Sequence, residues 1–364
     1  MRILVLNAGS SSLKTSLIEE PDERTVSRAE LQVAPAPDAW TDALRSAVAG
    51  AGEPDAVGHR IVHGGVRYTA PLRLDAGVVT DLDALRALAP LHNGPALEVV
   101  DSARRAMPKV PQVACFDTAF HATLPPAAYV YPLPYAWHGE WGVRRFGFHG
   151  LSVAWSVERA AALLGVATED LAVIVAHLGS GCSVTAVLGG RSLDTSMGMT
   201  PLEGLMMGTR SGSVDPGILL DLLEYPRLSL PELAEALQHE AGLLGVSGVS
   251  ADARVVQRAA DRGSARADLA LEMFVRRAAA AIGAAATALS RVDAVVFTGG
   301  IGEHADRIRA QICERLSPLG VPADLRSADG DAILTPPGAP VAVLRIAARE
   351  DLVIAREVAS LLST

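Results

Sequence analysis

The sequence predicts an α/β protein built from two similar domains. Its 364 residues exceed what one ordinary hydrophobic core organises, so two domains are expected. Apolar strand-like runs alternate with segments of helical periodicity, which is typical of α/β layers. Each half also opens with the same pattern of strand, Gly/Ser turn and strand, at residues 3–18 and again at 171–187. Together these observations favour a duplicated domain.

The two hairpins carry the first functional hint. In the first, the polar turn spans residues 7–12, and in the second the turn spans residues 177–181. Turns of this kind present clustered backbone N–H groups, which form a concavity that binds anions such as phosphate. Two like domains with such turns could face one another across a cleft. The hairpins could also be unrelated features of an α/β protein.

The remaining elements follow from hydrophobic spacing. Residues 19–53 have weak periodicity and several prolines, so no element is predicted there. A buried strand at residues 293–298 is expected to end in a glycine-rich turn at 299–302. Further strands are expected at 57–62, 110–116 and 341–346, and helices at 80–88, 95–105, 151–164, 230–238, 255–262, 265–289, 305–316 and 350–362.

Composition excludes several classes of function. The formal net charge is −9 without a long charged block, which argues against nucleic acid or an anionic membrane as the main partner. Cys115, Cys182 and Cys313 are odd in number and widely spaced, so neither a disulfide framework nor a zinc site fits, and a reducing cytosol does. The apolar runs at 3–6 and 278–289 are too short for a signal peptide or a membrane span. A cytoplasmic protein is therefore expected.

Familiar catalytic motifs are missing, but polar residues gather at strand ends and in glycine-rich turns. The chain has no Walker-type phosphate loop, no Gly-x-Ser-x-Gly elbow and no His-Glu-x-x-His pair. A single histidine beside glycine is more often a packed residue than a catalyst, so the number of such residues carries the interpretation. Strand ends converge on the ligand crevice of an α/β sheet. Arginines, together with a carboxylate that can hold Mg²⁺, are the groups that phosphoryl transfer requires. The residues in question are Arg60, Asp117, His149, His177 and Arg210.

The longest of these segments covers residues 194–212. It is dense in Gly, Thr and Met, hardly charged and nearly without periodicity. Surface loops are usually more polar, so this segment is better placed lining a cleft.

Nine segments resemble motifs of the acetate kinase family, in the order in which that family carries them. The family belongs to the superfamily of actin, sugar kinases and heat-shock chaperone ATPases, and the resemblance runs from Arg2 to Glu357. The segments are LVLNAGSSSLK, HRIVHGG, APLHNGP, FDTAFH, RRFGFHG, HLGSG, DTSMGMTPLEGLMMGTRSG, GLLGVSG and FTGGIGE.

The resemblance implies a fold and a reaction. The fold would be a duplicated βββαβαβα core of the actin-like ATPase or ribonuclease H-like type around a central cleft. Residues 1–121 with 352–364 would form the N-terminal domain and 122–351 the nucleotide-binding domain. The reaction would be reversible transfer of a phosphoryl group from ATP to acetate, giving acetyl phosphate and ADP with Mg²⁺ or Mn²⁺. A homodimer is implied as well.

Roles of individual residues are also implied by the resemblance, through matched positions. Arg60 and Arg210 would hold the carboxylate and the transferring phosphoryl group, His149 would steady that group, and His177 and Asp117 complete the catalytic set. Asn7 and Glu350 would bind the metal ion, which Asp117 helps to organise. The acyl pocket would be Val62, Leu91, Phe148 and Pro201. The nucleotide side would be Asn7, Ser10, Ser12, Lys14, His177, Leu178, Gly179, Ser180, Gly181, Asp252, Ala253, Arg254, Gly299, Gly300, Ile301, Gly302 and His304.

Three positions depart from the family pattern. Ser180 and His304 stand where Asn is usual, and Ala253 stands where an aromatic residue often lies near adenine. These departures predict a weak and permissive purine site. They leave the chemistry intact, because acetate is already ionised and direct transfer needs charge neutralisation rather than a strong base.

Two other functions stay open. A propionate or butyrate kinase of the same family would differ only in pocket volume, and one methylene is worth about 1–3 kcal/mol of discrimination. A nucleotide-regulated binding protein of the chaperone ATPase type would lack the paired arginines and the apolar acyl pocket. Arg60, Arg210, Val62 and Leu91 argue against that second alternative.

Overall fold

The structure is a computed structural model in which the chain forms two compact units. Unit 1 comprises Met1–Ala122, Phe148–Trp155 and Arg349–Thr364, and unit 2 comprises Thr123–Gly147 and Ser156–Ala348. The structure describes residues 1–9, 12–33, 39–48, 53–86, 90–225 and 227–363.

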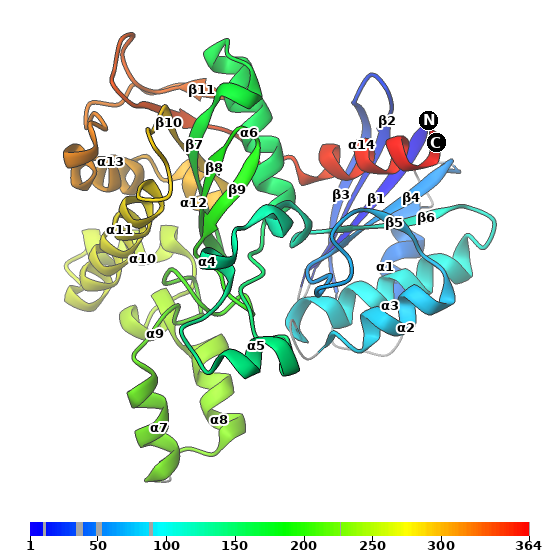
Figure 1. Cartoon of the computed structure of the whole chain (residues 1–364), viewed down its shortest axis with the longest axis horizontal. Helices are drawn as coiled ribbons and strands as arrows, with labels where there is room; N and C mark the ends of the chain where they lie inside the picture. Colours follow the sequence, from blue (N-terminus) through cyan, green and yellow to red (C-terminus); the bar gives the residue numbers. More distant parts are fainter. Residues whose placement is uncertain (10–11, 34–38, 49–52, 87–89, 226, 364) are drawn as a thin grey trace. The chain divides into compact units, whose positions relative to one another are not determined.

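Unit 1 contains a six-stranded mixed sheet in the order β3-β2-β1-β4-β6-β5 (Figure 1). Three strands form an antiparallel meander, and β4 and β6 then run parallel to β1, with β5 antiparallel at the edge. The strands are β1 (Arg2–Ala8), β2 (Ser12–Glu19), β3 (Arg24–Gln32), β4 (Ala56–Ile61), β5 (Leu72–Arg73) and β6 (Gln112–Phe116).

Helices cover both faces of this sheet, because alternate residues of each strand point to opposite faces. Leu4 and Leu6 of β1 pack in the core formed with α1 (Ala39–Val48), α2 (Ala76–Asp83) and α3 (Pro90–Ala106). Ile3 and Val5 pack in the core formed with α14 (Glu350–Ser363), drawn in red in Figure 1.

Unit 2 repeats the topology of unit 1. Its sheet has the order β9-β8-β7-β10-β12-β11, again with three antiparallel strands, two strands parallel to the first, and a short antiparallel edge strand. The strands are β7 (Ala172–Leu178), β8 (Cys182–Leu188), β9 (Arg191–Thr195), β10 (Ala294–Thr298), β11 (Ala332–Ile333) and β12 (Ala342–Arg345).

The other helices lie within or continue into unit 2. The described residues include no helix that is both long and apolar enough to cross a membrane. A π-helical turn, Ala236–Glu240, follows α8, and short 3-10 helices lie at Ala119–Thr123, Thr168–Asp170 and Ser317–Leu319. The α-helices are α4 (Pro126–Tyr129), α5 (Tyr135–Trp141), α6 (Gly150–Leu164), α7 (Pro216–Glu224), α8 (Leu230–Glu235), α9 (Gly242–Ser247), α10 (Ala253–Asp261), α11 (Ala265–Ala286), α12 (Gly299–His304) and α13 (Asp306–Arg315).

The predicted α/β class and the duplicated βββαβαβα core are confirmed, and three local predictions need correction. Residues 19–53, for which no element was predicted, contain β3 and α1. Residues 299–302 begin helix α12 instead of forming a turn. The helix predicted at 80–88 begins earlier, at Ala76, because the Asp75 side chain accepts a hydrogen bond from the Val78 amide and caps it there.

Candidate functional site

Arg60 is the centre of a charged cluster in unit 1. Its Nε and Nη2 donate to the two carboxylate oxygens of Asp117, at 2.9 Å and 2.6 Å, in a bidentate fork. Its Nη1 lies 3.1 Å from Oε2 of Glu350 and donates to Oδ1 of Asn7 at 3.2 Å. The Asn7 amide donates in turn to the same oxygen of Glu350, at 3.2 Å. All four predicted residues therefore form one hydrogen-bonded network.

The sheet register explains why these residues meet. β1, β4 and β6 are parallel and adjacent, with Leu6 paired to His59 and Ile61 paired to Phe116. Their carboxyl ends consequently lie at one edge, where Asn7 and Arg60 are the next-to-last residues of β1 and β4, and Asp117 directly follows β6. Glu350 is the first residue of α14, and a helix N-terminus favours a carboxylate in its first turn.

The cluster contains two carboxylates, Asp117 and Glu350, and one guanidinium, so its net charge is negative. The Asp117 residue is 1% exposed and the Arg60 side chain 16% exposed. Burial alone would lower the pKa of the Arg60 guanidinium, but the charges of Asp117 and Glu350 outweigh burial and raise that pKa. A net negative charge and oxygen donors from Asn7, Asp117 and Glu350 fit a Mg²⁺ ion, which takes one or two protein carboxylates and completes its shell with water and phosphate. Within the described ranges, no group of three or more His, Cys, Asp or Glu side chains could hold a metal ion by itself.

His149 is tied to the same edge through the backbone. It has a φ of 57°, a left-handed conformation that is rare outside glycine and costly unless the surroundings hold it. The next residue, Gly150, begins α6, and its amide donates to the Asp117 carbonyl at 2.9 Å. A Cβ at Gly150 would overlap that carbonyl, so glycine is required for this close approach. His149 is therefore placed one residue from a backbone contact with Asp117.

The predicted acyl-pocket residues of unit 1 are buried. Val62, directly after β4, is 5% exposed, and Phe148 is 1% exposed. The Phe148 ring lies edge-on to His63, with ring centroids 5.5 Å apart, so the segments that follow β4 and precede α6 are in contact. Leu91 lies in α3, and its side chain is outside the described part of the chain. Pro201 belongs to unit 2.

The first Gly/Ser turn is described only in part. Ser10 lies outside the described residues. The Gly9 amide donates to the Ser12 carbonyl at 2.8 Å, which closes the turn into β2. Lys14 pairs with Asn7 across the two strands, so both side chains leave the same face of the sheet. The Lys14 ammonium lies 3.7 Å from Glu30, with 59% of the side chain exposed.

In unit 2, the second Gly/Ser turn lies against the start of α12. The Gly179 amide donates to the Gly181 carbonyl at 3.0 Å. A Cβ at Gly299, which has a φ of +76°, would come within 2.8 Å of the Leu178 carbonyl and 3.1 Å of the His177 Nε2. Glycine at position 299 thus lets backbone, rather than side chains, form the surface shared by the turn and α12. Gly300, Ile301 and Gly302 continue that surface within the helix.

Arg210 lies on the 194–212 segment of unit 2 and is held differently from Arg60. Its Nη1 donates to the Pro201 carbonyl at 2.6 Å, and its own carbonyl accepts from the Met207 amide at 3.1 Å. Among the residues that the structure describes, its guanidinium has no carboxylate partner. Burial lowers the pKa of Arg210, and burial also raises the pKa of the neighbouring Cys182 thiol to about 12. Within the described ranges, the positive charge of Arg210 is therefore not compensated by a carboxylate.

The remaining nucleotide-side residues of the prediction lie in two places. The Gly208 amide donates to the Ser180 carbonyl at 3.3 Å, which connects the 194–212 segment to the Gly/Ser turn. Asp252 caps α10 and binds the Arg254 guanidinium at 2.7 Å, with the Arg254 side chain 80% exposed. Ala253 is 6% exposed. The His304 side chain is 76% exposed at the end of α12, so its imidazole projects into solvent.

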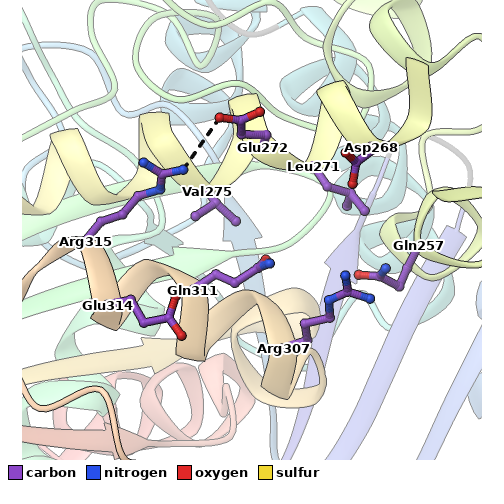
Figure 2. A pocket seen from close by; sticks show the side chains of 9 residues that line it. All are labelled: Gln257, Asp268, Leu271, Glu272, Val275, Arg307, Gln311, Glu314 and Arg315. Carbon is purple, nitrogen blue, oxygen red and sulfur yellow. Dashed lines mark ion pairs between the residues drawn. The ribbon is translucent and has the colours of Figure 1, made fainter. Parts of the chain in front are cut away.

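A separate cavity of about 330 Å³ lies among α10, α11 and α13 (Figure 2). Charged side chains of both signs line it, and Arg315 lies 3.7 Å from Glu272 across it. None of the predicted site residues belongs to its lining, which consists of Gln257, Asp268, Leu271, Glu272, Val275, Arg307, Gln311, Glu314 and Arg315.

Sequence reasoning gave no role to Tyr131, Arg145 and Glu203, which join into one network in unit 2. Arg145 Nη2 donates to Glu203 at 2.8 Å, and the Tyr131 hydroxyl also donates to Glu203. The motifs that contain Arg145 and Glu203 pointed to this region, but neither motif includes Tyr131. The partners lie 58 and 72 residues apart in the chain, so no local pattern could have paired them.

The chain is similar to known proteins along nearly its whole length. Residues 41–356 match the family model described as the acetokinase family. The chain is 44% identical over 402 residues to the acetate kinase of Synechococcus sp. (strain JA-2-3B'a(2-13)), an alignment that covers 100% of this chain and 99% of that protein. Among solved structures, acetate kinase from Porphyromonas gingivalis is 35% identical with a TM-score of 0.88, and the alignment covers 99% of both chains. A propionate kinase from Francisella tularensis is also 35% identical, with a TM-score of 0.90 and 98% of both chains covered.

Proposed function

Because the chain belongs to the acetokinase family, we propose that it is an acetate kinase, an enzyme that moves a phosphoryl group reversibly between ATP and acetate. The observation that carries the proposal is the state of its two arginines. Arg60 is oriented by a bidentate carboxylate, and Arg210 has no compensating carboxylate among the described residues. Each arginine suits one of the two anions of the reaction, a carboxylate and a phosphoryl group.

Arg60 is proposed to orient the acceptor. Its fork is fixed by Asp117, and its third nitrogen, Nη1, bridges Asn7 and Glu350, so the plane of the guanidinium is set before any ligand arrives. A preorganised donor costs no reorganisation when the reaction occurs. Val62 and Phe148, both buried, are proposed to contact the acyl chain. Because acetate is an anion at neutral pH, no base is needed to activate it.

Arg210 and the histidines are proposed to act on the phosphoryl group. A partly buried guanidinium that has no carboxylate partner among the described residues attracts an anion more strongly than one that is already paired. His149 and His177 are proposed to donate hydrogen bonds to the phosphoryl oxygens. Backbone groups of the 177–181 turn and of α12 are proposed to bind the nucleotide, because the glycines there leave backbone N–H groups unobstructed by side chains.

A divalent cation is part of the proposal. Asn7 and Glu350 would hold Mg²⁺ or Mn²⁺, with Asp117 beside them. When bound, the ion neutralises charge on the phosphates. Transfer is proposed to be direct, since no step requires an enzyme nucleophile. A homodimer remains a prediction from the family resemblance, and a cytoplasmic location remains a prediction from the composition of the sequence.

A hydroxamate assay tests the function. The purified chain is incubated with Mg²⁺, with ATP, GTP or pyrophosphate, and with acetate, propionate or butyrate, and hydroxylamine traps the acyl phosphate. Formation of acetyl hydroxamate with ATP, at a kcat/KM at least equal to that for propionate, is the expected result. Preferred use of propionate or butyrate would reassign the substrate. Nucleotide binding without any acyl phosphate would favour the binding-protein alternative.

A further inference from the structure

We propose that Arg145, Tyr131 and Glu203 form a brace that positions Arg210 for catalysis. The inference rests on the proposed function, because it concerns the same phosphoryl-transfer site. None of the three residues is assigned to substrate, nucleotide or metal. They are positioning residues, which act through the segment that carries Pro201.

Arg145 is the hub of the brace. Its Nη1 donates to the carbonyls of Ser196 and Met197, at 3.1 Å and 3.0 Å, and its Nη2 donates to Glu203 at 2.8 Å. Its Nε donates to the Ala128 carbonyl at 3.3 Å, which anchors the guanidinium to the end of α4. One side chain that is 16% exposed thus holds both ends of the segment between residues 196 and 203.

Tyr131 and the backbone hold the middle of the same segment. The Tyr131 hydroxyl donates to Glu203 and accepts from the Met199 amide at 3.0 Å. The Gly198 carbonyl accepts from the Phe146 amide at 3.0 Å. A Cβ at Gly198 would overlap the Glu203 carboxylate and the Tyr131 hydroxyl, so the brace lies directly over the backbone there. Residues 196, 197, 198, 199 and 203 are all fixed by this network.

Met197 is fully buried, but packing alone does not fix the two ends of the segment. It contains no helix or strand after Thr195, and the side of it at Ser196 and Gly204 borders an open cavity of about 310 Å³. The cavity is walled on its far side by alanines of α11, including Ala281 and Ala285. A segment that faces open space on one side depends on directed hydrogen bonds for its position.

The position of the segment determines the position of Arg210. The Pro201 carbonyl, which lies between the braced residues Met199 and Glu203, accepts the hydrogen bond from Arg210 Nη1 at 2.6 Å. This hydrogen bond orients a guanidinium that has no carboxylate partner among the described residues. If the brace loosens, the carbonyl moves, and the guanidinium loses its preset orientation without losing its charge. A shift of this kind lowers turnover more than it lowers ground-state binding.

The smallest test is Tyr131→Phe, which removes one hydroxyl and keeps the ring. We expect kcat for acetyl phosphate formation to fall about tenfold, since a hydroxyl bonded to a charged group is lost, while KM for ATP changes less than about twofold. Tyr129→Phe is the matched control, because the Tyr129 hydroxyl makes no hydrogen bond within the described ranges. Arg145→Lys should reproduce the loss. Its control is Arg144→Lys, because Arg144 stacks on Tyr129 at 3.9 Å and, among the described residues, its side chain donates a hydrogen bond only to the Arg145 carbonyl.

A double-variant cycle separates positioning from general damage. If Tyr131 acts through Arg210, then Tyr131→Phe should lower kcat less than about twofold in an Arg210→Lys background. Amide hydrogen exchange should also quicken at Met199 in Tyr131→Phe. An undiminished tenfold effect in the Arg210→Lys background would overturn the proposal, and so would normal kcat in folded Tyr131→Phe and Arg145→Lys. If the wild-type chain forms no acyl phosphate, the proposed function fails on its own, and unchanged exchange at Met199 would still refute the brace.

Discussion

Removing Arg60 should destabilise the protein and removing Arg210 should hardly change its stability, although both changes should abolish most activity. Arg60 compensates Asp117, a carboxylate that is 1% exposed, whereas Arg210 binds one backbone carbonyl. Arg60→Ala therefore leaves a buried anion without its fork, and Arg210→Ala removes a desolvated cation together with one hydrogen bond. The fold makes the first change destabilising and the second nearly neutral.

The magnitudes follow from this difference in charge compensation. Breaking a buried ion pair by deleting one partner costs about 3–5 kcal/mol, and about 1 kcal/mol shifts the Tm of a domain of this size by roughly 2–4 °C. Arg60→Ala should thus lower Tm by roughly 10 °C. Arg210→Ala should change stability by about 1 kcal/mol at most, because the lost hydrogen bond offsets the relief of desolvation. Each should lower kcat by about 10²–10³, since an electrostatic donor at the transition state is worth about 2.7–4 kcal/mol.

The assay combines thermal unfolding by circular dichroism with acetyl phosphate formation on the same preparations. A double variant, Arg60→Ala with Asp117→Asn, provides the control. Removing the orphaned charge should recover part of the lost Tm and none of the lost kcat. Near-normal kcat in folded Arg210→Ala would refute the role proposed for its charge, and an unchanged Tm in Arg60→Ala would refute the compensation argument.

Three further outcomes are expected. Val62→Ala should raise the propionate-to-acetate ratio of kcat/KM about tenfold by opening room for one methylene, and an unchanged ratio in steady-state kinetics would remove Val62 from the acyl pocket. ATP and GTP should be used with kcat/KM values within about one order of magnitude. The reason is that Ala253 cannot stack on a base and that the Arg254 guanidinium is held by the carboxylate of Asp252, the N-cap residue of α10. An ATP preference above about a hundredfold, or no gain in activity from Ala253→Phe, would contradict this expectation. Burial lowers the pKa of His59 and of His121 to about 4, so the unfolded chain binds more protons below pH 6.5. Stability should fall by about 2 kcal/mol per histidine between pH 7 and pH 5, and urea unfolding of His59→Gln should show a shallower decline.

The Arg60 network could be predicted in part from the sequence. Short apolar runs located β4 and β6, and a polar residue at the end of each run was expected at a common edge. That inference requires only that the carboxyl ends of parallel strands lie at the same edge of the sheet, which does not depend on the conformation of the loops between them. Glu350, nearly three hundred residues after Arg60, came from the family resemblance, because nothing in the local pattern of a C-terminal helix pairs it with a distant strand.

β3 and α12 are two of the elements that escaped prediction, and each did so for a physical reason. β3 is an edge strand whose residues are mostly exposed and include Arg24 and Arg28, so it lacks the alternation that marks a half-buried strand. Such charges suit an edge, but they make the strand look like a loop. At α12, the glycines of residues 299–302 predict a turn, yet tertiary contact with the turn at 177–181 outweighs their low helix propensity.

Three arginines stand in glycine-rich segments and look alike in the sequence, and their surroundings give them different tasks. Arg145 is bound by Glu203 and by backbone carbonyls on several sides, so its charge and its donors are committed to holding the chain. Arg60 is oriented by Asp117 and Glu350, and the same two carboxylates belong to the proposed Mg²⁺ site. The guanidinium and the metal ion would therefore share these carboxylates. Arg210 has one carbonyl and, in the part of the chain that the structure describes, no carboxylate. Its charge is therefore the one most available to an incoming phosphoryl group. The partners around each guanidinium, which a sequence does not contain, are the basis for the different roles proposed for the three arginines.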